Sequence, residues 1–70
     1  MIRDDKELKV TLDRITHFQQ TVQHLRQSEP DSENYKAAAE GYLAEIDKMN
    51  LEVREYLASH PKELRTTSSG

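Results

Sequence analysis

The sequence contains no cysteine, only two glycines and two prolines, and no long run of apolar residues. The absence of cysteine excludes disulfide bonds and thiolate metal sites as sources of stability. No stretch approaches the roughly 20 apolar residues that a membrane-spanning helix needs, and the charged N-terminus lacks the apolar segment of a signal peptide. We therefore expect a cytoplasmic protein without a membrane segment.

The chain is also short and polar. It has 70 residues, of which 34% are hydrophobic, and its mean hydropathy is -0.93. A chain of this size buries only about 60% of the surface that it exposes when unfolded, so it is marginally stable alone. Because no disulfide can form, we expect a partner chain to supply the missing stability.

The charge is distributed unevenly along the chain, whose net charge is -3. Residues 1–28 contain five Lys/Arg against four Asp/Glu, residues 29–60 contain three against eight, and residues 61–70 contain two against one. Nucleic-acid binding requires a basic stripe that neutralises phosphates, and the sequence has no such stripe. Direct binding of nucleic acid is therefore not expected.

The first helix is predicted over about residues 4–27, which contain no proline or glycine. Asp4 has the residue type of an N-cap, and Glu7 would complete a capping box with it. Residues 1–3 are a short lead. Apolar residues then recur every three or four positions, which is the period of one helix face. They are Leu8, Leu12, Ile15, Phe18, Val22 and Leu25.

The second helix is predicted over about residues 32–59, after a turn at residues 28–32 that contains Pro30. Either Asp31 or Ser32 could cap it. Its apolar residues follow a strict 3.5-residue repeat, typical of a coiled-coil seam. They are Tyr35, Ala39, Tyr42, Ile46, Met49, Val53 and Tyr56, with Leu43 and Leu57 beside them. Pro61 stops the helix, and residues 61–70 are predicted to be a disordered tail.

A short turn between two long helices predicts an all-α, antiparallel two-helix hairpin over residues 1–60. The first stripe places Leu8, Ile15 and Val22 at heptad a and Thr11, Phe18 and Leu25 at d, with Leu12 at e. In the second helix the tyrosines and Met49 are at d, and Leu43 and Leu57 are at e. A stripe this wide is typical of helix bundles. We therefore expect two hairpins to dimerise into a four-helix bundle, with all these apolar residues at the helix interfaces.

No catalytic or metal site emerges from the remaining residues. His17 and His24 are seven residues apart, too far for ligands on one helix, and are expected to face solvent. The three tyrosines could form an aromatic ligand platform, but their heptad spacing favours core packing. Gly41, beside three alanines, suggests a close approach of helices at the dimer interface, with neutral tolerance as the alternative. We expect no enzyme activity, cofactor or metal.

The first eleven residues, MIRDDKELKVT, resemble the start of small bacterial proteins in which a helical hairpin precedes a Cro/repressor-type helix-turn-helix domain, often in antitoxins. These 70 residues contain no counterpart of the recognition helix. The resemblance therefore implies an oligomerisation or toxin-contacting module rather than a DNA reader. Two functions stay open: a regulatory, antitoxin-like module that binds a second protein, and a purely structural self-assembling protein with no further partner.

Overall fold

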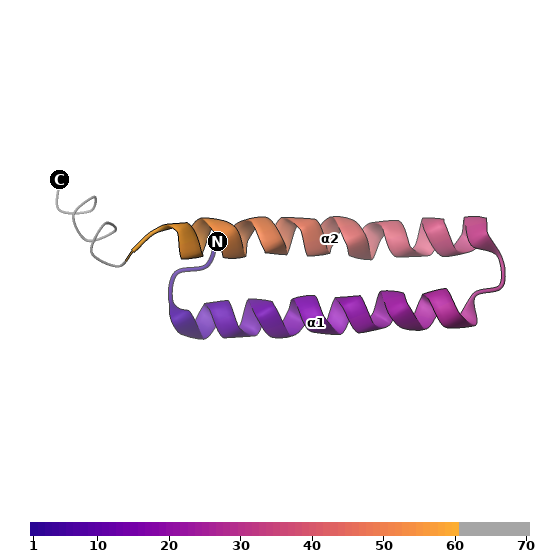
Figure 1. The fold of residues 1–70 in the computed structure, drawn as a ribbon, viewed down its shortest axis with the longest axis horizontal. Helices are drawn as coiled ribbons and strands as arrows, with labels where there is room; N and C mark the ends of the chain where they lie inside the picture. The colour runs from indigo at the N-terminus through magenta and orange to yellow at the C-terminus, as the bar shows by residue number, and fades with distance from the viewer. Residues whose placement is uncertain (61–70) are drawn as a thin grey trace.

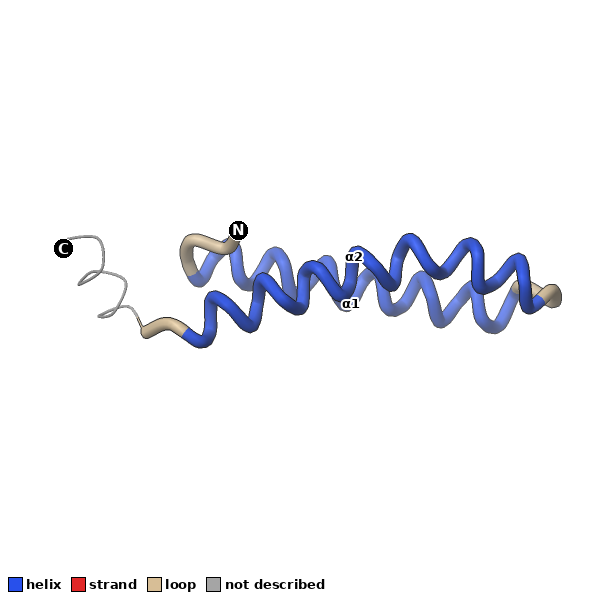
Figure 2. Tube along the Cα trace, turned by 90° about the horizontal axis from the view of Figure 1, so that it is seen from above, coloured by secondary structure: helices blue, strands red, loops and turns tan. Residues whose placement is uncertain are grey.

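The computed structural model describes residues 1–60. These residues form two α-helices, α1 (Asp5–Ser28) and α2 (Ser32–Ala58), and no strand. The helices run antiparallel and lie side by side along their whole length (Figure 1). They cross at a shallow angle when seen from above (Figure 2). The predicted all-α hairpin is confirmed, whereas the predicted tail at residues 61–70 lies outside the described residues.

Helix α1 begins where the sequence places a cap. The backbone of Asp4 is extended, and its carboxylate Oδ1 accepts a hydrogen bond from the Glu7 N–H at 2.8 Å. This bond satisfies one of the four N–H groups that the first turn leaves without a partner. At the other end the Glu29 N–H donates to the Leu25 carbonyl at 2.9 Å. The chain leaves the helix at this point because Pro30 disfavours helical geometry at the preceding residue.

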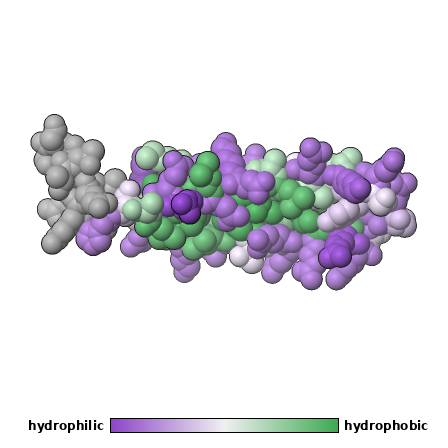
Figure 3. All heavy atoms as spheres, turned by 45° about the horizontal axis from the view of Figure 1, so that its top comes forward, coloured by the Kyte–Doolittle hydropathy of each residue, from purple (hydrophilic) through white to green (hydrophobic). Residues whose placement is uncertain are grey.

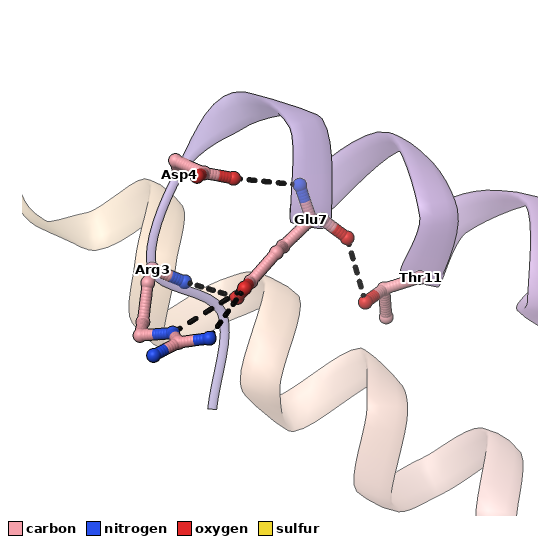
Figure 4. Close-up of polar contacts among 4 residues, drawn as sticks. All are labelled: Arg3, Asp4, Glu7 and Thr11. Carbon is pink, nitrogen blue, oxygen red and sulfur yellow. Dashed lines mark hydrogen bonds and ion pairs between the residues drawn. The ribbon is translucent and has the colours of Figure 1, made fainter.

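The predicted capping box forms only in part, because Glu7 bonds to a different residue than expected. Its Oε1 accepts from the Arg3 backbone N–H at 3.0 Å, and its Oε2 accepts from the Arg3 guanidinium at 3.0 and 3.3 Å (Figure 4). In a regular capping box the glutamate accepts from the cap residue itself, which is Asp4 here. Glu7 therefore anchors the segment that precedes the helix.

Helix α2 is capped by Asp31, which decides between the two candidates in the turn. Its carboxylate accepts from the N–H groups of Glu33 at 2.9 Å and Asn34 at 3.1 Å. The helix continues through Gly41 without a positive φ angle and ends at Ala58. Both helices thus begin directly after an aspartate. Its carboxylate accepts hydrogen bonds from the unpaired N–H groups of the first turn, and its negative charge interacts favourably with the positive end of the helix dipole.

The core between the helices is a single row of side chains. Ile15, Ile46 and Met49 are buried and form one cluster, and Phe18, Val22 and Val53 pack against it. Every residue predicted at heptad a or d is buried or half-buried, except Tyr42. The 3.5-residue repeat therefore identifies correctly the side of each helix that packs against the other helix.

Ile2 is a core residue that the helical periodicity does not reveal, because it lies in the lead at residues 1–3, outside both predicted helices. Only 6% of Ile2 is exposed. The lead leaves the start of α1 and turns toward α2 (Figure 1), and Ile2 lies beside Glu52 and Tyr56 of α2. An apolar residue two positions before the N-cap was the available signal, since apolar residues that precede a helix often pack back against it.

Candidate protein-interaction surface

The hairpin has two long faces, one on each side of its core. In an antiparallel pair, heptad g positions of both helices lie on one side and e positions on the other. The structure agrees, because the g residues Glu7, Arg14, Glu45 and Glu52 line one common groove. We call this side the clasp face. The opposite side, with the e residues of both helices, is the open face.

The clasp face is covered at one end by the N-terminal segment. The Met1 ammonium group lies 3.4 Å from Oε2 of Glu52 on α2, and Ile2 is buried beneath it. Arg3 pairs with Glu7 at 3.0 Å. The hydrogen bonds from Arg3 lower the pKa of Glu7 from its usual value. The segment is thus held to both helices, by a carboxylate on each.

A second polar contact joins the same ends of the two helices. The Tyr56 hydroxyl donates a hydrogen bond to Oδ1 of Asp5 at 2.6 Å. This bond to a carboxylate raises the pKa of Tyr56 to about 12, because a phenolate there would lose the bond and repel Asp5. Further along, the rings of Phe18 and Tyr42 meet edge to face with centroids 5.5 Å apart. Tyr56 and Tyr42 therefore both contact α1 within the hairpin.

The open face carries apolar side chains that nothing in the single hairpin covers. Leu12 is 44% exposed, Leu43 is 47% exposed and Leu57 is 64% exposed. All three are heptad e residues, so they lie on the same side of the core. Figure 3 shows a face of the molecule on which apolar atoms form a band along the hairpin, with hydrophilic atoms on both sides. Three leucines in one such row are more than the scattered apolar residues of an ordinary surface.

The structure separates the predicted interface residues into three groups. The first is buried: Ile15, Ala39, Ile46 and Met49. The second is half-buried between the helices: Leu8, Phe18, Val22, Leu25, Tyr35, Val53 and Tyr56. The third is exposed: Leu12, Tyr42, Leu43 and Leu57. The first two groups hold the hairpin together, as does Tyr42 through its ring contact with Phe18, and the three exposed leucines are free to contact another chain.

Three other large aliphatic residues, Met1, Val10 and Leu51, are exposed away from the open face. Val10 is at heptad c and lines the groove of the clasp face, whereas Leu51 is at heptad f on the outer side of α2. His17 and His24 are also exposed. Across residues 1–60, no three metal-ligating side chains gather in one place. Neither α1 nor α2 is long and apolar enough to cross a membrane.

No family model, curated protein or solved structure matches the chain. The open face is therefore identified as a candidate interaction surface from the exposure and spacing of its leucines alone.

Proposed function

We propose that the hairpin is a non-catalytic oligomerisation module that pairs with a second copy of itself into a four-helix bundle. The observation that supports this proposal is the open face, where Leu12, Leu43 and Leu57 are 44–64% exposed beside a core only one row thick. Covering these side chains on both copies would supply roughly 5–9 kcal/mol before the entropy cost of association. This contribution is similar in size to the whole free energy of unfolding of a small domain, which is about 5–15 kcal/mol.

The test is the oligomeric state of the whole chain. Sedimentation equilibrium over a dilution series at micromolar concentrations should show a reversible dimer, and the melting midpoint should rise with protein concentration because assembly and folding are linked. A stable, helical monomer with a midpoint independent of concentration would contradict the proposal.

A matched pair of variants connects the dimer to the open face. Leu57→Glu places a charge in the row of exposed leucines and should shift the chain toward monomer. Leu51→Glu makes the same chemical change on the same helix at a side chain of similar exposure, 56% against 64%, but outside the open face. It should leave the dimer intact. Equal effects of the two substitutions would show that the open face is not the contact.

A regulatory, antitoxin-like role is the alternative, in which the same face binds a different protein. The resemblance of residues 1–11 to the start of such proteins favours it. Affinity purification from the native host should then recover one protein in stoichiometric amount. Its recovery should be lost with Leu57→Glu and retained with Leu51→Glu, whereas a purely self-assembling protein would recover only its own copies.

A further inference from the structure

We infer that the second copy binds the open face in one specific register, with the two α2 helices antiparallel and a two-fold axis passing at Asn50. This inference depends on the proposed self-association and adds to it the contacts that determine the dimer. It follows from three features of the described residues: which face is free, how the leucines are spaced, and where the charges beside them lie.

The free face is the first feature. On the clasp face, the N-terminal segment occupies one end, with Ile2 buried and the Met1 ammonium group against Glu52. The rest of that groove is lined largely by polar and charged side chains, including Arg14 and Glu45. Within residues 1–60 no segment covers the open face, which carries the exposed leucines. A second hairpin that docked on the clasp face would have to displace the N-terminal segment, so the open face is favoured.

The leucine spacing is the second feature. On α2, Leu43 and Leu57 each lie seven residues from Asn50, which is about 10.5 Å along the helix in either direction. A two-fold axis perpendicular to the helices at Asn50 therefore places Leu43 opposite Leu57 of the second copy, and Leu57 opposite Leu43. A surface of this kind is self-complementary, as a two-fold interface requires.

The same axis also satisfies the open face of α1. The contacts of Asp5 with Tyr56 and of Phe18 with Tyr42 define the register of the hairpin. In that register Leu12 lies at about the same height along the helix axes as Met49, the neighbour of Asn50. The axis therefore places Leu12 against Leu12 of the second copy. All exposed leucines of the open face thus meet leucines, and every helix has antiparallel neighbours.

The other two-fold arrangement is less favourable. An axis parallel to the helices would place α1 of one copy against α2 of the other. In the register of the hairpin, Leu43 would then face Gln19, and Leu57 would face Asp5. Burying a leucine against Asp5 removes water from a carboxylate that keeps one hydrogen bond, from Tyr56, and leaves its remaining acceptor sites without a partner, which is costly. The antiparallel α2 pairing avoids this cost.

The charges on α2 are the third feature. Asp47 and Arg54 lie at heptad b, directly outside the row formed by Leu43 and Leu57. Neither makes an ion pair within residues 1–60, where the ion pairs are those of Met1 with Glu52 and of Arg3 with Glu7. The axis at Asn50 brings Asp47 to within one residue of the level of Arg54 of the second copy, and the reverse. Two equivalent ion pairs then flank the leucines at the rim of the interface.

The experiment is an exchange of these charges, measured by sedimentation equilibrium at low salt. Asp47→Arg alone and Arg54→Asp alone each place like charges together at both ends of the contact, and each should weaken the homodimer about tenfold. An equimolar mixture of the two variants should form a heterodimer, because arginines then face aspartates at both ends. The double variant Asp47→Arg/Arg54→Asp should regain the affinity of the wild type.

Lys48→Asp is the matched control, since Lys48 lies in the groove of the clasp face. It changes the net charge by the same amount as Arg54→Asp and should leave the dissociation constant unchanged. Circular dichroism should show that each variant keeps its helical content, because all three positions are exposed on the surface of α2.

A covalent test uses the absence of cysteine from the chain. Asn50→Cys places the thiols of two copies together at the axis, so mild oxidation should give a disulfide-linked dimer in high yield. Lys48→Cys should stay largely monomeric on a denaturing gel. Poor cross-linking at position 50 would overturn the proposed register.

The outcomes distinguish this inference from the proposed function. A monomeric wild type overturns both. A wild-type dimer that is insensitive to Asp47→Arg and Arg54→Asp overturns the register and leaves self-association standing. The register is also overturned if both single variants dimerise weakly and their equimolar mixture forms no tighter heterodimer, because Asp47 and Arg54 then do not face each other.

Discussion

Replacing Gly41 by alanine should stabilise the protein, although glycine at this position suggested a close approach of helices. Gly41 lies inside α2, has no positive φ angle, and a Cβ added there meets no atom within 4 Å. No steric cost therefore arises within the hairpin. Glycine in a helix interior is about 0.8–1.0 kcal/mol less favourable than alanine, because it loses more backbone entropy on folding. The free energy of unfolding should rise by about 1 kcal/mol.

For a domain of this size, about 1 kcal/mol corresponds to a rise of roughly 4–8 °C in the melting midpoint. The assay is circular dichroism during urea and thermal unfolding at one fixed protein concentration, since association contributes to stability. Ala44→Gly is the control. Ala44 is exposed on the same helix, so the reverse change should lower the free energy of unfolding by a similar amount.

The result also bears on the arrangement of the two copies. Gly41 lies at heptad c, away from the open face, so a dimer formed through Leu43 and Leu57 leaves it in solvent. If Gly41→Ala destabilises the protein or weakens the dimer, a helix of another chain packs closely against Gly41. The assignment of the open face as the contact would then be wrong.

Three further predictions concern the core, a cap and a titrating group. Ile46→Ala should lower the free energy of unfolding by about 2–5 kcal/mol, because Ile46 is 6% exposed and packs with Ile15 and Met49; a loss below about 1 kcal/mol in urea unfolding would place the core elsewhere. Asp31→Ala should cost about 1 kcal/mol by removing two hydrogen bonds to the first turn of α2, and unchanged urea unfolding would show that this cap contributes nothing. The pKa of Tyr56 is raised from 10.0 to about 12 in the folded protein, so its hydrogen bond to Asp5 stabilises the fold below pH 10, and this stability is lost as the pH rises through about 12. Tyr56→Phe should reduce that alkaline loss in urea titrations between these pH values, whereas equal slopes for the variant and the wild type would contradict the role of the bond.

The sequence by itself predicted the secondary structure and the facing sides of the helices. The sequence predicts that Asp4 caps α1, that Pro30 interrupts the chain and that the repeat from Tyr35 to Tyr56 lines the core, and the structure places them so, except that Tyr42 is exposed at the edge of the core. These features are local or periodic. A cap acts within one turn, proline acts on its neighbour, and a heptad repeat specifies a face whatever the partner.

Only the tertiary structure decided which apolar residues the hairpin covers and which it leaves exposed. Ile2 was assigned to a lead and is buried, while Leu57 belongs to the predicted stripe and is 64% exposed. Both outcomes depend on the direction in which the N-terminal segment crosses the hairpin, which the bond between Glu7 and Arg3 helps to hold. Periodicity describes each helix separately, whereas the choice between the clasp face and the open face depends on contacts between residues about 50 positions apart, such as Met1 with Glu52.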